Sequence, residues 1–354
     1  MIVRNEAAVI RRCLDSVKPL IDTWCIVDTG STDGTQAIIR EHMHGVPGEL
    51  HERLWVDFAT NRTQALSLAR RTADYTLVID ADDVLSIPPG FTLPALTADS
   101  YTFDFDFANT RYRRTQLIRN TIPWRYRGVV HEFLEGPGAQ TTGHLPLTIV
   151  VGNDGARRQD PEKYRKDAAI LERALKTETD PFMRSRYTFY LAQSWRDAGA
   201  KRKAIVSYAA RTEMGFWQEE VFISLLNEAR LLESLGLMDT VERHYTLATE
   251  AAPHRAEAIH GAALFLRMAQ RYETAYETAR RGIGLTAPPD GLFVEPWIYD
   301  YGLLDELAIS GYWSGHYRES VDACEVILSE GKIPEHERPR IVANANFARR
   351  KLLG

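Results

Sequence analysis

The sequence has few cysteines and no long apolar segment. Its three cysteines, Cys13, Cys25 and Cys324, show neither CxxC spacing nor a neighbouring histidine, which argues against a disulfide framework or a zinc knuckle. No run reaches the roughly 18 apolar residues of a transmembrane helix, and no signal peptide opens the chain. We therefore expect a soluble, cytoplasmic protein whose cysteines serve packing.

Strong charge of one sign is also missing. The formal net charge of −5 gives no overall attraction to nucleic acid, and the length of 354 residues suits two domains. The densest run of basic residues lies either on a solvent-exposed strand edge or in a binding site for a phosphorylated ligand. It consists of Arg111, Arg113, Arg114, Arg119, Arg125 and Arg127.

Residues 1–155 alternate short apolar runs with helical patterns, which is typical of an α/β sheet domain. We predict strands at residues 1–3, 24–27, 54–56 and 75–79, and helices at residues 6–20, from 35 onward and at 61–71. Further on, Phe103, Phe105 and Phe107 alternate with Asp104 and Asp106, the period of a half-buried strand.

Residues 160–354 are helical and repeat themselves. Four small or β-branched lead residues recur 37, 34 and 45 positions apart, close to a period of about 34. The leads and their partners are Ala204 with Tyr208, Val241 with Tyr245, Ala275 with Ala279, and Ser320 with Cys324. A small residue precedes each lead by twelve positions, as Ala192, Ala229, Ala263 and Ala308. This pattern predicts a tetratricopeptide-like array, interrupted by the proline-rich loop 286–296.

Three carboxylates follow the apolar run 75–79, namely Asp80, Asp82 and Asp83. Like charges placed together repel one another, and they are tolerated when they share a hard divalent cation. Acidic pairs after strands also serve as turn formers or helix caps. The Asp80-Ala81-Asp82 triplet is therefore a candidate metal site with a structural alternative.

A second polar segment, residues 26–35, reads as a strand, a turn and a helix start. Asp28 at the strand end could accept a hydrogen bond from a base N–H or a ribose hydroxyl, and Gly30 would let the backbone approach a ligand. The structural alternative is a capped turn, with Asp33 capping a helix that begins near Thr35.

Taken together and in order, four segments resemble the family-2 glycosyltransferases. They are Met-Ile-Val-Arg-Asn-Glu at residues 1–6, Val-Asp-Thr-Gly-Ser-Thr-Asp-Gly-Thr at 27–35, the Asp-Phe and Asn-Arg pairs within 57–62, and Ile-Asp-Ala-Asp-Asp at 79–83. More narrowly they resemble the bacterial subgroup in which a short GT-A domain is fused to tetratricopeptide repeats. Residues 124–132, which end in Gly-Val-Val-His-Glu, are similar to the Gly-x-x-His-Glu segment of that subgroup.

The resemblance implies a GT-A domain over residues 1–155, with a Rossmann-like mixed sheet, and a TPR-like helical domain over 160–354. It further implies an inverting transferase that uses a UDP- or GDP-sugar with Mn²⁺ or Mg²⁺. Asp82 would bind the metal. The nucleotide and sugar would be held by Val3, Asn5, Glu6, Asp28, Arg62, Asp80 and Ala81. The first strand is shorter than the family usually has, so either the chain is trimmed or the sheet edge is short.

Two adjacent residues, His131 and Glu132, are candidates for the remaining chemistry. A neutral imidazole at His131 would complete the metal shell, and Glu132 would remove the proton from an acceptor hydroxyl. Asp104 and Asp106 are rival bases. The structural alternative is a loop pair that only braces the sheet.

Two other classes of function stay open at this stage: a TPR scaffold with a relic nucleotide-binding domain, and a nucleotidyltransferase. The acceptor could be a peptide or protein, a saccharide or a modified nucleic-acid base, because repeat arrays present extended binding surfaces. Self-association through the repeats is a further open expectation.

Overall fold

The computed structural model describes residues 1–107, 110–152, 154–155 and 160–353, without the side chains of Phe107, Thr110 and Arg111. The chain divides into two compact units. The first comprises residues 1–108 and 112–198, and the second comprises residues 109–111 and 199–354. No helix in the described ranges is long and apolar enough to cross a membrane.

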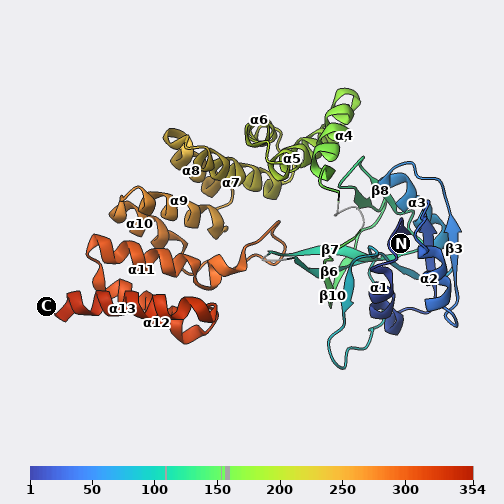
Figure 1. Ribbon diagram of the computed structural model, residues 1–354, viewed down its shortest axis with the longest axis horizontal. Helices are drawn as coiled ribbons and strands as arrows, with labels where there is room; N and C mark the ends of the chain where they lie inside the picture. Colours follow the sequence, from blue (N-terminus) through green and yellow to red (C-terminus); the bar gives the residue numbers. More distant parts are fainter. Residues whose placement is uncertain (108–109, 153, 156–159, 354) are drawn as a thin grey trace. The chain divides into compact units, whose positions relative to one another are not determined.

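A small parallel sheet opens the first unit (Figure 1). Its strand order is β1-β2-β3, formed by Ile2–Val3, Trp24–Asp28 and Gly48–Glu52. Helix α1, Ile10–Val17, buries Ile10, Cys13, Leu14 and Val17, and helix α2 spans Thr35–His42. The first two predicted strands and the helix start at Thr35 are confirmed, although the backbone cap of α2 is Gly34.

The strand predicted at residues 54–56 is wrong. The third strand lies earlier, at Gly48–Glu52, and Leu54 is 89% exposed. The reason is Asn61, whose side-chain amide donates to the Leu54 carbonyl at 3.0 Å and accepts from the Val56 N–H at 2.9 Å. These bonds tie the segment to the start of helix α3, Phe58–Ala69, instead of to a neighbouring strand.

A second, mixed sheet has the strand order β4-β7-β6-β10-β5. Its strands are β4 (Tyr75–Leu77), β5 (Val84–Ser86), β6 (Ser100–Phe107), β7 (Thr110–Arg119) and β10 (Thr142–Val150). Phe103 and Phe105 are buried, which confirms the half-buried strand, whereas the side chain of Phe107 lies outside the described part. A hairpin of β8 (Arg125–Arg127) and β9 (Phe133–Glu135) follows β7. The predicted mixed sheet is thus present.

Helices α4, Lys163–Thr177, and α5, Pro181–Asp197, belong to the same compact unit as the sheets. Val130 lies in one buried cluster with side chains of both helices, and Arg127 forms an ion pair with Asp180. The first compact unit therefore ends at residue 198, beyond the boundary near 155–160 that the change of periodicity predicts.

The second unit is a stack of antiparallel helices, coloured from yellow-green to red in Figure 1. They are α6 (Lys201–Thr212), α7 (Gln218–Ser234), α8 (Val241–Ala251), α9 (Ala256–Met268), α10 (Tyr272–Gly282), α11 (Leu303–Ser314), α12 (Tyr317–Glu330) and α13 (Arg338–Leu353). All four predicted lead residues and the small residues twelve positions earlier are buried. Ser320 even donates its hydroxyl hydrogen to the Ala308 carbonyl at 2.7 Å. The repeat pattern correctly predicted which positions are buried.

The predicted loop at 286–296 is present, between α10 and α11. It is fixed by a buried arginine, Arg255, which donates to the Leu292 carbonyl at 3.1 Å and pairs with Glu257 at 2.8 Å. The Leu292 N–H in turn donates to Glu219 at 2.7 Å. Because these groups are buried and paired, the loop is a fixed part of the helical unit.

Candidate active site

Two loops at the carboxyl ends of β1 and β2 interlock. The Asn5 side chain accepts from the Thr32 N–H at 2.8 Å, and the Asn5 N–H donates to the Ser31 hydroxyl at 2.9 Å. Asp33 accepts from the Ala7 N–H at 3.0 Å. The amide of Asn5 therefore shapes the site through the neighbouring loop, a use of this residue that its sequence position alone did not reveal.

Asp28 is buried at the end of β2, with only 1% of its surface exposed. Its Oδ1 accepts hydrogen bonds from the N–H groups of Gly30 and Ser31, both at 2.9 Å, and from Gln36 at 3.2 Å. Within the described residues its Oδ2 has no hydrogen-bond partner. An unpaired buried acceptor is costly, so this oxygen is a place for a donor group of a ligand.

The predicted residues Arg62, Asp80 and Glu132 come together. Arg62 Nη2 donates to Asp80 Oδ1 at 2.5 Å. Arg62 Nε forms an ion pair with Glu132 Oε1 at 2.6 Å, but this nitrogen has no hydrogen-bond partner among the described residues. The guanidinium carbon of Arg62 lies over the Tyr126 ring, 5.4 Å from the ring centre. Burial alone would raise the pKa of Asp80, but Arg62 holds that pKa below its ordinary value.

The next two aspartates, Asp82 and Asp83, lie near residues 152–155 of the same unit. Asp83 is buried and accepts from the Gly152 N–H at 3.1 Å, and burial beside Asp80 raises its pKa to about 7. The carbonyl of Asp82 accepts from Arg12 Nη2 at 2.9 Å. A Cβ on Gly155 would lie 2.6 Å from Asp82 Oδ2, so the absent side chain leaves room for this carboxylate.

Three other predicted donor-site residues act through the main chain. The Val3 carbonyl accepts from the Thr29 N–H at 2.9 Å, and the Glu6 N–H donates to the Thr35 hydroxyl at 2.9 Å. The side chains of Val3 and Ala81 lie in the hydrophobic core. A ligand could reach Val3 and Ala81 only at their backbone atoms.

His131, which was predicted to bind the metal together with Asp82, lies against helix α5. Its ring stacks on Tyr190 of α5, with ring centres 4.1 Å apart and planes 6° apart. Across the described ranges, no three His, Cys, Asp or Glu side chains converge in a group that could hold a metal ion. The assignment of Asp82 and His131 as metal ligands therefore stays a prediction.

One residue of the basic run belongs to the site. The guanidinium of Arg114 lies 5.8 Å from the centre of the Phe105 ring. Burial would lower its pKa, but Tyr126 and Asp80 raise it. The sequence predicted a functional run of arginines but could not show which of them lies near Asp80. Arg113, the neighbouring arginine, donates to Asp104 at 3.1 Å. The side chain of Arg111 lies outside the described residues.

Comparison with known proteins shows a similarity in the first unit. The model of Glycosyl transferase family 2 matches residues 1–127. This part of the chain is therefore similar to the family 2 glycosyltransferases.

Two curated relatives share parts of the chain. A TPR repeat-containing protein of Synechococcus elongatus is 32% identical over 148 residues, 38% of this chain and 34% of the relative. An uncharacterized glycosyltransferase of Rickettsia felis is 36% identical over 86 residues, 24% of this chain and 28% of the relative. The chain thus spans about a third of the length of these relatives. A crystal structure of a tetratricopeptide repeat protein from Parabacteroides merdae is 17% identical, with a TM-score of 0.41, and the match covers 55% of this chain and 72% of that one.

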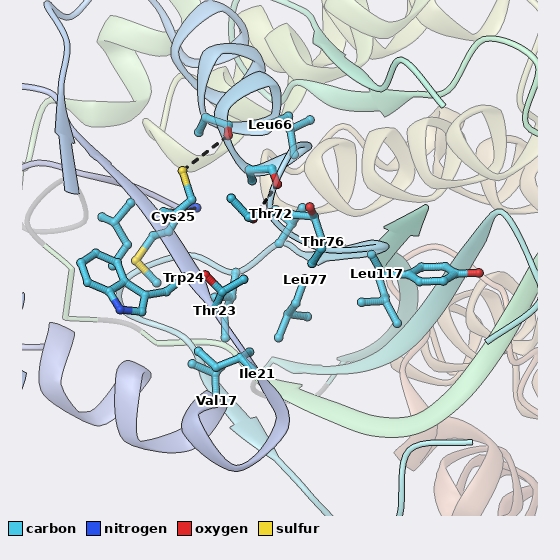
Figure 2. A pocket seen from close by; sticks show the side chains of 18 of the residues that line it. Val17, Ile21, Thr23, Trp24, Cys25, Leu66, Thr72, Thr76, Leu77 and Leu117 are labelled. Carbon is cyan, nitrogen blue, oxygen red and sulfur yellow. Dashed lines mark hydrogen bonds between the residues drawn. The ribbon is translucent and has the colours of Figure 1, made fainter. Parts of the chain in front are cut away.

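The first unit also contains a cavity of about 310 Å³ between β2, α3 and β4. Figure 2 shows its largely apolar lining, with Trp24 and Cys25 on one side and Leu77 and Leu117 on the other. Among the charged groups described above, only Arg62 reaches it. Because Asp28, Asp80, Asp82 and Glu132 do not line the cavity, it is not the place of a charged diphosphate.

Proposed function

We propose that this glycosyltransferase is an inverting enzyme that moves a sugar from a nucleoside-diphosphate sugar, UDP- or GDP-linked, to an acceptor hydroxyl or other nucleophile. The observation that carries the proposal is the buried Oδ2 of Asp28, which has no hydrogen-bond partner in the part of the chain that the structure describes. It fits an N–H of the base or a hydroxyl of the ribose. Asp80 and Asp82 follow β4 in the same domain, on the sugar and diphosphate side of the donor.

A divalent cation, Mn²⁺ or Mg²⁺, fits this arrangement. Such hard cations take oxygen ligands, and Mg²⁺ is often held by one or two carboxylates together with substrate phosphates. Asp82 supplies a carboxylate against which Gly155 leaves space. When bound, the cation would neutralise charge on the departing diphosphate. The small number of protein ligands is consistent with a cation that binds along with the donor.

Glu132 is the proposed base. Its Oε1 is fixed by Arg62, so its other oxygen is the one that accepts the proton of the acceptor. Arg114, buried near Asp80 and Tyr126, adds positive charge on the donor side. The candidate acceptors are a peptide or protein, a saccharide and a modified nucleic-acid base.

The direct test needs no acceptor. UDP-, GDP-, CDP- and TDP-sugars are incubated with the protein and Mn²⁺, and slow donor hydrolysis is followed. Free nucleoside diphosphate is expected; pyrophosphate would favour nucleotidyl transfer, and absence of any product with every donor would favour a scaffold. Asp82→Asn should weaken cation-dependent donor binding, and unchanged affinity in the presence of a chelator would refute the metal assignment.

The base is tested separately. Glu132→Gln should lower the transfer rate by about 10²–10⁴-fold, the usual contribution of general base catalysis, and leave donor affinity nearly unchanged. Asp104→Asn is the matched control, since its carboxylate pairs with Arg113 instead of Arg62. A Glu132→Gln enzyme that keeps its rate would exclude Glu132, and a rate lost in Asp104→Asn would place the base there.

A further inference from the structure

The segment Gly128–Glu132, which carries the proposed base, is bent into a conformation that it does not favour by itself. His131 has a φ of 51° and Gly128 a φ of 121°. A residue other than glycine in the left-handed region costs about 1–3 kcal/mol and persists only when its surroundings hold it there. The bend therefore needs contacts from outside the segment.

Those contacts come from one face of helix α5. Arg186 Nη2 donates to the His131 carbonyl at 3.1 Å, and the Val129 N–H donates to the Tyr187 hydroxyl at 3.3 Å. Tyr190 stacks on the His131 ring, and the Arg186 guanidinium lies 4.9 Å from the centre of the Tyr190 ring. Position 190 is a surface neighbour of both 186 and 187, because it lies four and three residues, about one helical turn, beyond them.

The other end of the segment is the ion pair of Glu132 with Arg62. Helix α5 thus holds one side of the bend, and the Glu132 carboxylate lies at the other side, in the candidate site. His131 is exposed, so its stacking on Tyr190 contributes little burial of the imidazole and mainly fixes the direction of the chain just before Glu132.

We propose that helix α5, outside residues 1–127, is part of the transfer machinery, and that Arg186, Tyr187 and Tyr190 are positioning residues for Glu132. This inference rests on the proposed role of Glu132 as the base. A displacement of about 1 Å at a catalytic group can cost about 10²-fold in rate. Loss of the α5 contacts should therefore reduce the rate of transfer while the donor-binding residues stay in place.

Tyr190 provides the test in the full-length chain. Tyr190→Leu should lower kcat about 10- to 100-fold with the donor KM within about twofold of wild type, since the base but not the donor site is displaced. Tyr190→Phe keeps the stacked ring and should retain at least half of the activity. Tyr272→Leu removes a comparable stacked tyrosine, which packs on Trp313 in the helical unit, and should leave kcat unchanged.

Several results would overturn the inference. They are a wild-type kcat in Tyr190→Leu, a Tyr190→Phe enzyme as weak as Tyr190→Leu, or a KM that rises in parallel with the loss of kcat. If wild-type protein hydrolyses no donor, the proposed function itself has failed.

The inference can also be judged without activity, by thermal unfolding of Tyr190→Leu, Glu132→Gln and the double variant. If α5 holds Glu132 against Arg62, the change in Tm caused by Glu132→Gln should shrink to less than half in the Tyr190→Leu background, because the two sites are coupled. Additive changes in Tm would show that α5 only packs.

Discussion

Arg62→Met removes the cation that Asp80 and Glu132 share, and its effect on stability can be worked from burial. The side chains of Arg62 and Glu132 are only 11% and 9% exposed. Removing one partner of a buried ion pair leaves an uncompensated charge and costs about 3–5 kcal/mol. Asp80 is 36% exposed and is screened by water, so most of the loss is assigned to Glu132. We expect the free energy of unfolding to fall by about 4 kcal/mol.

Urea denaturation at pH 7 measures this loss, and the same domain offers a matched control. Arg113 pairs with Asp104, and their side chains are 31% and 44% exposed. Exposed pairs are worth about 0–1 kcal/mol, so Arg113→Met should have little effect. The two variants remove the same type of side chain and differ mainly in the burial of the partner carboxylate.

A double variant separates charge burial from lost packing. Arg62→Met combined with Glu132→Gln removes the unpaired charge and should recover more than half of the lost stability. The reasoning is refuted if Arg62→Met costs no more than Arg113→Met, or if the losses of the two single variants simply add in the double variant.

Three further predictions concern other parts of the chain. Burial lowers the pKa of His260 to about 4 from 6.5; because the unfolded chain takes up the proton first, stability should fall by about 3 kcal/mol between pH 6.5 and 4, and His260→Phe should abolish this loss in pH-dependent urea titrations. Ala65 lines the cavity, so Ala65→Leu should raise the free energy of unfolding by about 1 kcal/mol. Ala168 is fully buried in a packed cluster, so Ala168→Leu should lower the free energy of unfolding by about 1–3 kcal/mol. Equal denaturation midpoints for the two variants would contradict this. A Cβ on Gly152 would lie 2.0 Å from the Asp82 carbonyl, so Gly152→Ala should weaken cation-dependent donor binding in titration calorimetry, and unchanged affinity would count against Asp82.

Periodicity predicted the positions that are buried, because burial is what a repeating apolar pattern reports. The lead residues of the repeats, Ala204 and Ala275 among them, are fully buried, and Phe103 and Phe105 lie in the sheet core. The pattern failed at residues 54–56, where three apolar residues resemble a strand. A single polar side chain, Asn61, takes their backbone hydrogen bonds, and such a competition is invisible to a hydrophobic pattern.

The sequence predicted which residues form the site but not which side chains they contact. The motifs selected Arg62, Asp80 and Glu132, which the fold does bring together. They could not show that the His131 ring stacks on Tyr190, 59 positions later, because such a contact depends on tertiary packing between segments with no shared periodicity. For the same reason the pattern could not show that α4 and α5, which are helical like the repeats, share a buried cluster with Val130.

The membership of α4 and α5 in the first unit sets a rule for recombining such proteins. A chimera that joins residues 1–160 to a foreign repeat array would discard the helices that enclose Val130 and pair with Arg127. A junction at Ala198 and Gly199 keeps them, and Gly199, with a φ of 74°, already forms a turn between two helices. The exchangeable helical module of this chain therefore begins at α6, after the helix pair α4 and α5.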